Sequence, residues 1–334
     1  MKVRLYRLIL LLLLAIALIP AETFGESKED ASGFSDNKKI YIKLVEKING
    51  SVDTVSSKVS EALAQNGWKV VAAFYPALPD NCKYKSKVLV IHNEKYWKTI
   101  FAASPNAKFV YPLRVNIYSD EKGTNISLVN PVALNRLISQ ELDNMSLEAL
   151  KSLTTAVQGA GGGQNVSKEE GTLLDGNRTH GIGGGLLEDN IVKIHTVRNK
   201  TENVINSIIK DLQSTIKRNK NGYYLVYSID MRENGIMLFG ISKKEVEKAA
   251  FTITGEKRVT KLNACPGIDH APAFPLEITV DSTGKSIKVE TLREMYRMNA
   301  YFGDTGEMAF MKHYFMPGKI EDEIITSTYM EVLQ

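Results

Sequence analysis

The stretches FPLEITVDSTGKSIKVE, at residues 274–290, and YPLRVNIYSDEKGTNISLVN, at residues 111–130, share one pattern. Each begins with an aromatic residue and a proline, alternates apolar and polar residues, turns at a glycine next to a lysine, and alternates again. Two alternating runs around a glycine-containing turn predict a β-hairpin. Because this hairpin recurs in one chain of 334 residues, we expect a unit of the fold to be present twice.

The residues around the first hairpin predict a complete α+β unit. Ser51 and Asn93 are typical helix N-caps, Gly67 is typical of a helix end, and Pro131 suits a first helical turn. The expected strands are 39–47, 68–78, 86–93 and the hairpin strands within 109–130; the expected helices are 51–67, 93–105 and one from Pro131 onward. The predicted order is therefore β-α-β-β-α-β-β-α.

The second half of the chain follows the same order around its own hairpin. The expected strands are 191–199, 223–231 and 235–242, and the expected helices are 202–219, 243–253 and 291–302, with an insertion near 255–273. We therefore predict two tandem copies, at 39–155 and 190–332, packed as an internal pseudo-dimer. The alternative is that unrelated hairpins of this class look alike.

Residues 156–189 join the two predicted copies and are rich in glycine and polar residues. Their lack of a period indicates a flexible linker or a long surface loop. The runs GAGGGQ and GIGGG lack the Gly-Lys-Ser/Thr ending of a phosphate loop, so they do not favour nucleotide binding.

The N-terminus has the pattern of an export signal. Lys2, Arg4 and Arg7 precede an apolar run at 8–19, and small residues allow cleavage after Ala21 or Gly25. The run is short for a bilayer span, which needs roughly 20 apolar residues. We expect residues 1–25 to be a signal peptide and the protein to be periplasmic or secreted; an uncleaved anchor is the alternative.

Composition limits the classes of partner. Removing residues 1–25 takes away three basic residues and one acidic residue, which lowers the formal net charge from +4 to +2. A nearly neutral chain lacks the positive field that binds nucleic acid. We expect no nucleic-acid partner, no stable membrane insertion after cleavage, an unidentified small-molecule or protein partner, and a monomer, because duplication supplies a pseudo-dimer within one chain.

The chain has two cysteines, Cys82 and Cys265. An oxidising compartment favours a disulfide between them, although sequence cannot supply the geometry. Otherwise they are buried or free thiols.

The first half resembles a known family. Asn66-Gly67-Trp68, VLVIHN at 88–93, and FVYPLRVNIYSDEKGTNISLVNP at 109–131 resemble the DUF302 family, whose fold is TT1751-like and α+β. Pro112-Leu113-Arg114, Ile117-Tyr118, Lys122-Gly123 and Asn130-Pro131 occupy the places of the family motifs. The likeness is clear for the first copy and faint for the second. Leu113 and Leu276 stand where some members have cysteine, so a thiol function at that position is absent. The resemblance implies a fold and no established activity.

Soft-metal chemistry is the sharpest hypothesis for a site. Thiolate, imidazole and thioether groups suit copper or haem iron. The candidate metal ligands are Cys265, His270, Met308, Met311, His313 and Met316, with Asp269 beside His270. The simpler interpretation is core packing, because methionine fills irregular gaps and no haem attachment motif is present.

These observations favour an exported, non-catalytic binding or accessory protein of unknown ligand. The alternatives are a periplasmic copper or haem protein and an enzyme with Cys265 as nucleophile and His270 as base. Aromatic residues such as Tyr96, Trp97 and Tyr223 are expected to pack the two cores.

Overall fold

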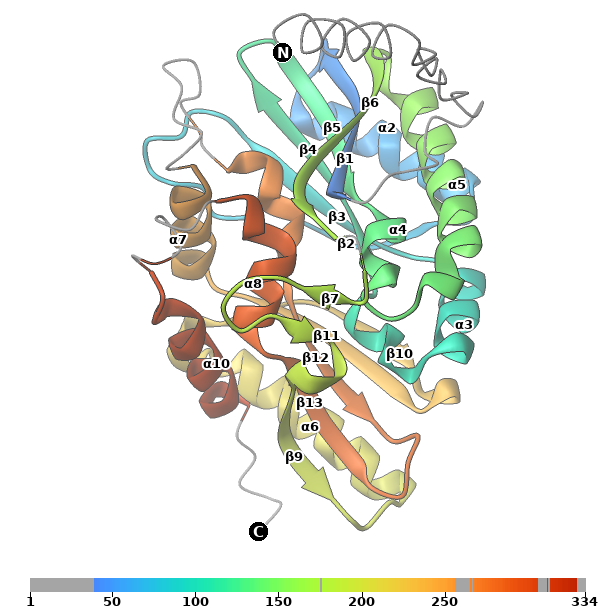
Figure 1. Ribbon diagram of the computed structural model, residues 1–334, viewed down its shortest axis with the longest axis vertical. Helices are drawn as coiled ribbons and strands as arrows, with labels where there is room; N and C mark the ends of the chain where they lie inside the picture. The colour runs from blue at the N-terminus through green and yellow to red at the C-terminus, as the bar shows by residue number, and fades with distance from the viewer. Residues whose placement is uncertain are drawn as a thin grey trace, which may run out of the picture. The chain divides into compact units, whose positions relative to one another are not determined.

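The computed structural model describes residues 39–174, 176–255, 265, 267–305, 311 and 313–328. All of them belong to one compact unit that extends over residues 36–334 (Figure 1). The predicted export segment, residues 1–25, lies outside the described residues. Within the described ranges, no helix combines the length and the apolar character that a membrane crossing requires.

The N-terminal half is a six-stranded antiparallel sheet with helices packed on it. The strands are β1 (Lys39–Ile48), β2 (Lys69–Phe74), β3 (Ser86–His92), β4 (Leu113–Asp120), β5 (Gly123–Val129) and β6 (Gln164–Leu173), in the spatial order β2-β3-β4-β5-β1-β6. The helices are α2 (Val52–Gln65), α3 (Glu94–Ala103), α4 (Pro131–Arg136) and α5 (Asp143–Gly161), with 3-10 turns η1 (Pro105–Phe109) and η2 (Gln140–Leu142).

The C-terminal half contains a five-stranded antiparallel sheet. Its strands are β9 (Ile191–Val197), β10 (Tyr224–Met231), β11 (Ile236–Ser242), β12 (Leu276–Asp281) and β13 (Ile287–Leu292), in the order β10-β11-β12-β13-β9. The helices are α6 (Glu202–Lys217), α7 (Lys244–Gly255), α8 (Glu294–Phe302) and α10 (Met316–Ser327). The 3-10 turns are η3 (Glu188–Asn190), η4 (Lys220–Gly222), η5 (Arg232–Asn234), η6 (Ile268–Ala273) and η7 (Gly303–Thr305).

The two sheets match strand for strand. The order β2-β3-β4-β5-β1 in the first corresponds to β10-β11-β12-β13-β9 in the second. Irregularities in register also coincide: Leu44 interrupts the β1–β5 ladder and Ile194 interrupts the β9–β13 ladder. The peptide bonds before Pro112 and Pro275 are both cis. The predicted α+β class with two antiparallel hairpins is confirmed.

Local signals place several element ends correctly. The side chain of Ser51 accepts a hydrogen bond from the Thr54 amide, and that of Asn93 accepts one from the Tyr96 amide, so both predicted N-caps are confirmed. The prediction of a single helix from Pro131 onward is wrong. Ser139 is extended and caps η2 between α4 and α5, because a serine side chain offers backbone groups an alternative to helical bonding.

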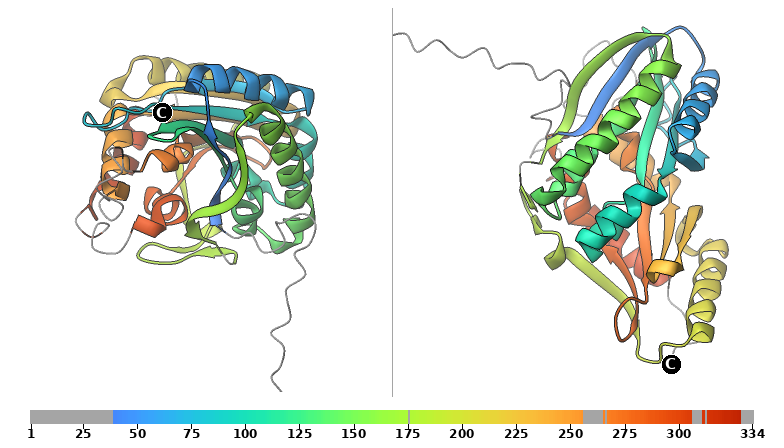
Figure 2. Two further views of the ribbon diagram at one scale, coloured as in Figure 1. Left: turned by 90° about the horizontal axis from the view of Figure 1, so that it is seen from above. Right: turned by 90° about the vertical axis from the view of Figure 1, so that its right-hand side faces the viewer.

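The segment predicted as a flexible linker, 156–189, is largely ordered structure. It contains the end of α5, strand β6, and the two-stranded sheet of β7 (Arg178–Thr179) and β8 (Gly185–Leu186). Figure 2 shows β6 beside β1, with which it pairs antiparallel. A Cβ at Gly163 would lie 2.5 Å from the Glu46 carbonyl oxygen, so this glycine permits close approach to β1 and does not signal disorder.

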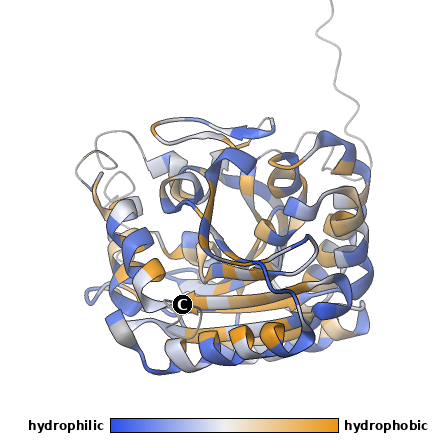
Figure 3. Ribbon diagram, turned by 90° about the horizontal axis from the view of Figure 1, so that it is seen from below, coloured by the Kyte–Doolittle hydropathy of each residue, from blue (hydrophilic) through white to orange (hydrophobic). Residues whose placement is uncertain are grey.

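Apolar residues concentrate on the strands, as Figure 3 shows by colour. Trp97 is completely buried, Tyr96 is 6% exposed and Tyr223 is 1% exposed, as expected for core aromatics. The strands at the contact between the halves also carry buried charged side chains. Buried charges are costly, so these side chains are candidate site residues.

Candidate functional site

An ion pair between Arg114 and Glu277 lies at the contact between the N-terminal and C-terminal halves. Arg114 is 2% exposed and Glu277 is 8% exposed. The Nη2 atom of Arg114 donates to the Glu277 carboxylate, and its Nη1 atom donates to the Pro272 carbonyl oxygen at 3.1 Å and the Tyr301 hydroxyl at 3.2 Å. Burial of a charge costs several kcal/mol unless it is paired, so these bonds require the two halves to remain in contact.

A second buried charge, Lys108, crosses the same contact from η1. Its Nζ atom contacts Asp281, and it lies 2.7 Å from the Glu290 carboxylate. Burial alone would raise the pKa of Asp281, but hydrogen bonding and the charge of Lys108 hold that pKa below its usual value. One cation of the N-terminal half therefore bridges carboxylates on two strands of the C-terminal half.

The cavity within this contact is small. It has a volume of about 10 Å³, which is close to the space that one water needs. Its lining includes Phe109, Glu277, Glu294, Arg297 and Tyr301. The carboxylate of Glu294 binds Arg297 at 2.7 and 2.8 Å, so these charges are also paired. The geometry favours a structural role for the buried charges.

His270, a predicted metal ligand, is completely buried between two carboxylates. Its Nδ1 atom lies 3.2 Å from Asp269 and its Nε2 atom lies 2.9 Å from Asp304. Its ring stacks on Phe302 and meets Tyr41 edge-on. Burial lowers the pKa of the imidazole, but the two carboxylates outweigh it and raise the pKa to about 9. His270 is therefore an imidazolium at neutral pH, and a protonated ring nitrogen is not a metal ligand.

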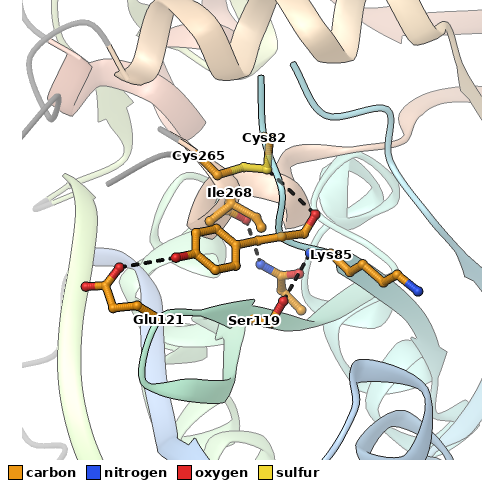
Figure 4. Close-up of a disulfide and its surroundings, with 8 residues drawn as sticks. Cys82, Lys85, Ser119, Glu121, Cys265 and Ile268 are labelled. Atoms are coloured by element: carbon orange, nitrogen blue, oxygen red, sulfur yellow. Dashed lines mark hydrogen bonds between the residues drawn. A yellow bond between two sulfur atoms is a disulfide. The ribbon is translucent and has the colours of Figure 1, made fainter. Parts of the chain in front are cut away.

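The two cysteines form a disulfide between Cys82 and Cys265, which are 183 residues apart (Figure 4). Cys82 lies in the β2–β3 loop, residues 75–85, and Cys265 lies just before η6. Cys265 packs with Tyr118 and Ile268. The Asn116 side chain donates to the Ile268 carbonyl oxygen at 3.0 Å. The disulfide alternative is confirmed, and Cys265 supplies neither a thiolate ligand nor a nucleophile in this state.

Glu247 on α7 makes another bond to the β2–β3 loop. Its carboxylate accepts from the Ala77 amide at 2.6 Å, the Tyr224 hydroxyl at 3.0 Å and the Ser242 hydroxyl. Burial raises the pKa of Glu247, and the hydrogen bonds oppose this shift. The loop is thus attached to the C-terminal half by a covalent bond and by a buried carboxylate.

Of the remaining predicted metal ligands, three lie at or shortly before the start of α10. Met311 is 53% exposed, while His313 and Met316 are partly exposed near the start of α10. Met308 lies outside the described residues. Within the described ranges, His, Cys, Asp and Glu side chains form no group of three suited to a metal ion. The convergence of the other predicted ligands around His270 stays a prediction, whereas Cys265 is held in the disulfide.

A larger pocket, of about 120 Å³, lies between the N-terminal half and the connecting segment, residues 162–190. It is lined by Ser104, Asn106, Leu137, Ile138, Asn177, Leu186, Leu187 and Glu188. An apolar cavity of about 150 Å³ holds benzene in another protein, so this pocket suits a small molecule or part of a larger one. Its amides, hydroxyl and carboxylate can donate and accept hydrogen bonds, whereas the leucine and isoleucine side chains offer an apolar wall.

A comparison with known protein families gives a match in the N-terminal half of the chain. The model of DUF302, a domain of unknown function, matches residues 44–160. Residues 44–160 are therefore similar to the DUF302 family. A crystal structure of an uncharacterized conserved DUF302 protein from Bacillus stearothermophilus is 14% identical, with a TM-score of 0.33; the match covers 37% of this chain and 98% of that one. No curated protein matches the sequence.

The matched segment, residues 44–160, contains Lys108 and Arg114, which are not among the site residues predicted from the sequence. A signal for Arg114 was present. It is a charged residue within the alternating run YPLRVNIY, and Glu277 stands at the same place in FPLEITV with the opposite charge. Opposite charges at the same place in two matching hairpins indicate that the two residues could pair. Lys108 gave no comparable signal, because it precedes the strand.

Proposed function

We propose that this chain is an exported, non-catalytic accessory protein that binds a small polar ligand in the pocket beside the connecting segment. Two tandem copies of one unit, the first of them the DUF302 domain, form its rigid body in this proposal. The soft-metal hypothesis, with copper or haem, has less support, because its thiolate is half of a disulfide and its buried imidazole is protonated.

The duplication is supported by equivalent positions at the contact. Leu113 pairs with Ile91, and Leu276 pairs with Ile241, so each hairpin has the same register against its neighbour. The next residues, Arg114 and Glu277, are therefore equivalent, and they bind each other. In a twofold dimer, a residue near the axis meets its own copy. An ion pair between equivalent residues fits an internal pseudo-dimer whose copies have since diverged.

Export is supported by the disulfide. Structural disulfides persist in oxidising compartments and are rare in the cytosol. The bond between Cys82 and Cys265 joins the two halves, and it agrees with the signal pattern at residues 1–25. The test is alkylation of free thiols in fractionated cells without reductant. A mature protein in the exported fraction with both cysteines protected supports this part of the proposal, whereas free thiols in the cytosol contradict it.

The pocket is the observation that carries the binding function. Its polar groups come from separate elements: Ser104 and Asn106 at η1, Asn177 in the connecting segment, and Glu188 in η3. Such convergence beside an apolar wall is typical of small-molecule sites. Neutral hydroxyl or amide groups fit the two asparagine side chains, and an amine fits Glu188.

A ligand screen tests this proposal. Thermal unfolding of the mature, oxidised protein is measured with a panel of polyols, sugars, amines and amino acids, because a ligand that binds only the folded state raises Tm. Ile138→Trp fills the pocket and is expected to abolish the shift, whereas Ile138→Leu preserves most of the volume and is expected to retain it. Shifts that persist equally in Ile138→Trp, or no shift with any compound in the wild type, contradict the assignment.

A further inference from the structure

The outer edge of β9 differs from the equivalent edge in the N-terminal half. Strand β1 lies between β5 and β6, whereas its counterpart β9 pairs with β13 and ends the sheet among the described residues. Figure 1 shows β9 at the margin of the lower sheet. An edge strand presents unpaired backbone donors and acceptors, which another strand can bind.

The N-terminal half shows what the equivalent edge accepts. Strand β6 pairs antiparallel with β1 through Tyr41 and Glu170, Ile42 and Glu169, and Lys43 and Lys168. Strands β1 and β9 occupy equivalent places in their sheets and have a register irregularity at the equivalent residue. Strand β9 therefore has the backbone geometry to accept an antiparallel strand.

The charged residues that flank β9 are complementary to those of a second β9 strand that runs in the opposite direction. Glu188 and Asp189 precede the strand, Arg198 and Lys200 follow it, and all four are exposed. In the part of the chain that the structure describes, Glu188, Asp189 and Arg198 enter no ion pair. Antiparallel pairing of β9 with another β9 centres on Ile194 and places each acidic end beside the basic end of the other strand. A parallel arrangement would place like charges together.

We propose that β9 is a homodimer interface: two copies of this chain pair their β9 strands antiparallel and extend the two five-stranded sheets into one. A twofold axis through Ile194 satisfies both edges at once. The proposal revises the expectation of a monomer, and it does not require a ligand in the pocket, although Glu188 also lines that pocket. Lys193 is the one charged residue within β9, and a lysine on an edge strand limits strand pairing, so the dimer is weak and concentration-dependent.

Charge reversal gives a specific test. One variant carries Glu188→Lys and Asp189→Lys, and the other carries Arg198→Glu and Lys200→Glu. Each variant alone brings like charges together at both ends of the paired strands. An equimolar mixture restores attraction at both ends, because the all-basic strand then faces the all-acidic one. Unfolding curves of each variant establish that it is folded.

Sedimentation velocity of the mature, oxidised protein, from roughly 1 to 500 μM, covers the range of weak complexes. We expect the wild type to dimerise, each variant to self-associate at least about tenfold more weakly, and the mixture to recover dimers, since several exposed pairs act together. Lys58→Glu with Lys95→Glu, on exposed faces of α2 and α3, is the matched control and leaves dimerisation unchanged.

Amide hydrogen exchange provides a second measurement that needs no variant. Exchange of residues 191–197 slows as protein concentration rises if β9 becomes an inner strand, while exchange in β2 stays unchanged. A wild type that remains monomeric over the whole range overturns the proposal. So does a dimer whose affinity is the same in both reversed variants, because its interface then lies elsewhere.

Discussion

Removal of the disulfide offers a strong test of how the two halves are held together. The perturbation is the double variant Cys82→Ala, Cys265→Ala. A cross-link stabilises the folded state mainly by restricting the unfolded chain, and its effect grows with the logarithm of the loop that it closes. The loop here spans 183 residues, for which that relation gives about 5 kcal/mol.

Urea unfolding followed by circular dichroism measures this loss. Because typical proteins are stable by only about 5–15 kcal/mol, the variant is expected to unfold at much lower urea concentration. Its Tm is expected to fall by roughly 10 °C or more. Tryptophan fluorescence reports on the N-terminal half separately, since Trp68 and Trp97 are both buried there.

The wild type under reducing conditions is the internal control. Dithiothreitol is expected to destabilise the wild type and to leave the double variant unchanged. A loss below about 1 kcal/mol would refute the reasoning, because the cross-link would then not restrict the unfolded chain as its loop length predicts.

Three further predictions concern buried charges. Arg114→Met is expected to lower the free energy of unfolding by about 3–5 kcal/mol, because it leaves the buried Glu277 carboxylate without its cation. The double variant Arg114→Met, Glu277→Met is expected to lose much less. Urea unfolding of both variants measures this, and equal losses would contradict the prediction. The pKa of His270 is about 9 in the folded protein and near 6.5 in the unfolded chain. Protonation of His270 therefore contributes about 3 kcal/mol to the free energy of unfolding. This contribution is fully present below pH 6.5 and is lost as the pH rises through 9. The stability difference between wild type and His270→Gln is therefore expected to shrink between pH 6 and pH 10, and a constant difference would argue against the charged imidazole. Burial raises the pKa of Glu247 in the folded protein, so ionisation of Glu247 destabilises the fold at pH values above the pKa of the unfolded chain. Glu247→Gln is therefore expected to stabilise the protein at pH 7 and to have little effect at pH 4. Urea unfolding at both pH values measures this.

Local sequence signals are sufficient to predict most of the secondary structure. Alternation identified both hairpins, and capping residues such as Ser51 and Asn93 placed helix starts. These signals act within a few residues, so they are readable without tertiary information. The recurrence of one element order also predicted the matching strand order of the two sheets.

Long-range contacts explain what the sequence could not supply. The glycines of 159–163 suggested a flexible linker, but Gly163 lies against the β1 backbone, which no local pattern records. His270 was interpreted by residue type as a metal ligand. Its environment depends on Asp304, which is 34 residues away in the sequence. For the same reason, the pairing of Lys108 with Asp281 and Glu290 could not be foreseen from its neighbours.

The ion pair between Arg114 and Glu277 also bears on the history of the molecule. If either half were released to associate with itself, two guanidinium groups or two carboxylates would meet at the buried position, and neither assembly would be stable. Each half therefore complements the other at this position and does not complement a second copy of itself. Under the proposed duplication, a return to a symmetric pair would require compensating changes on both sides at once.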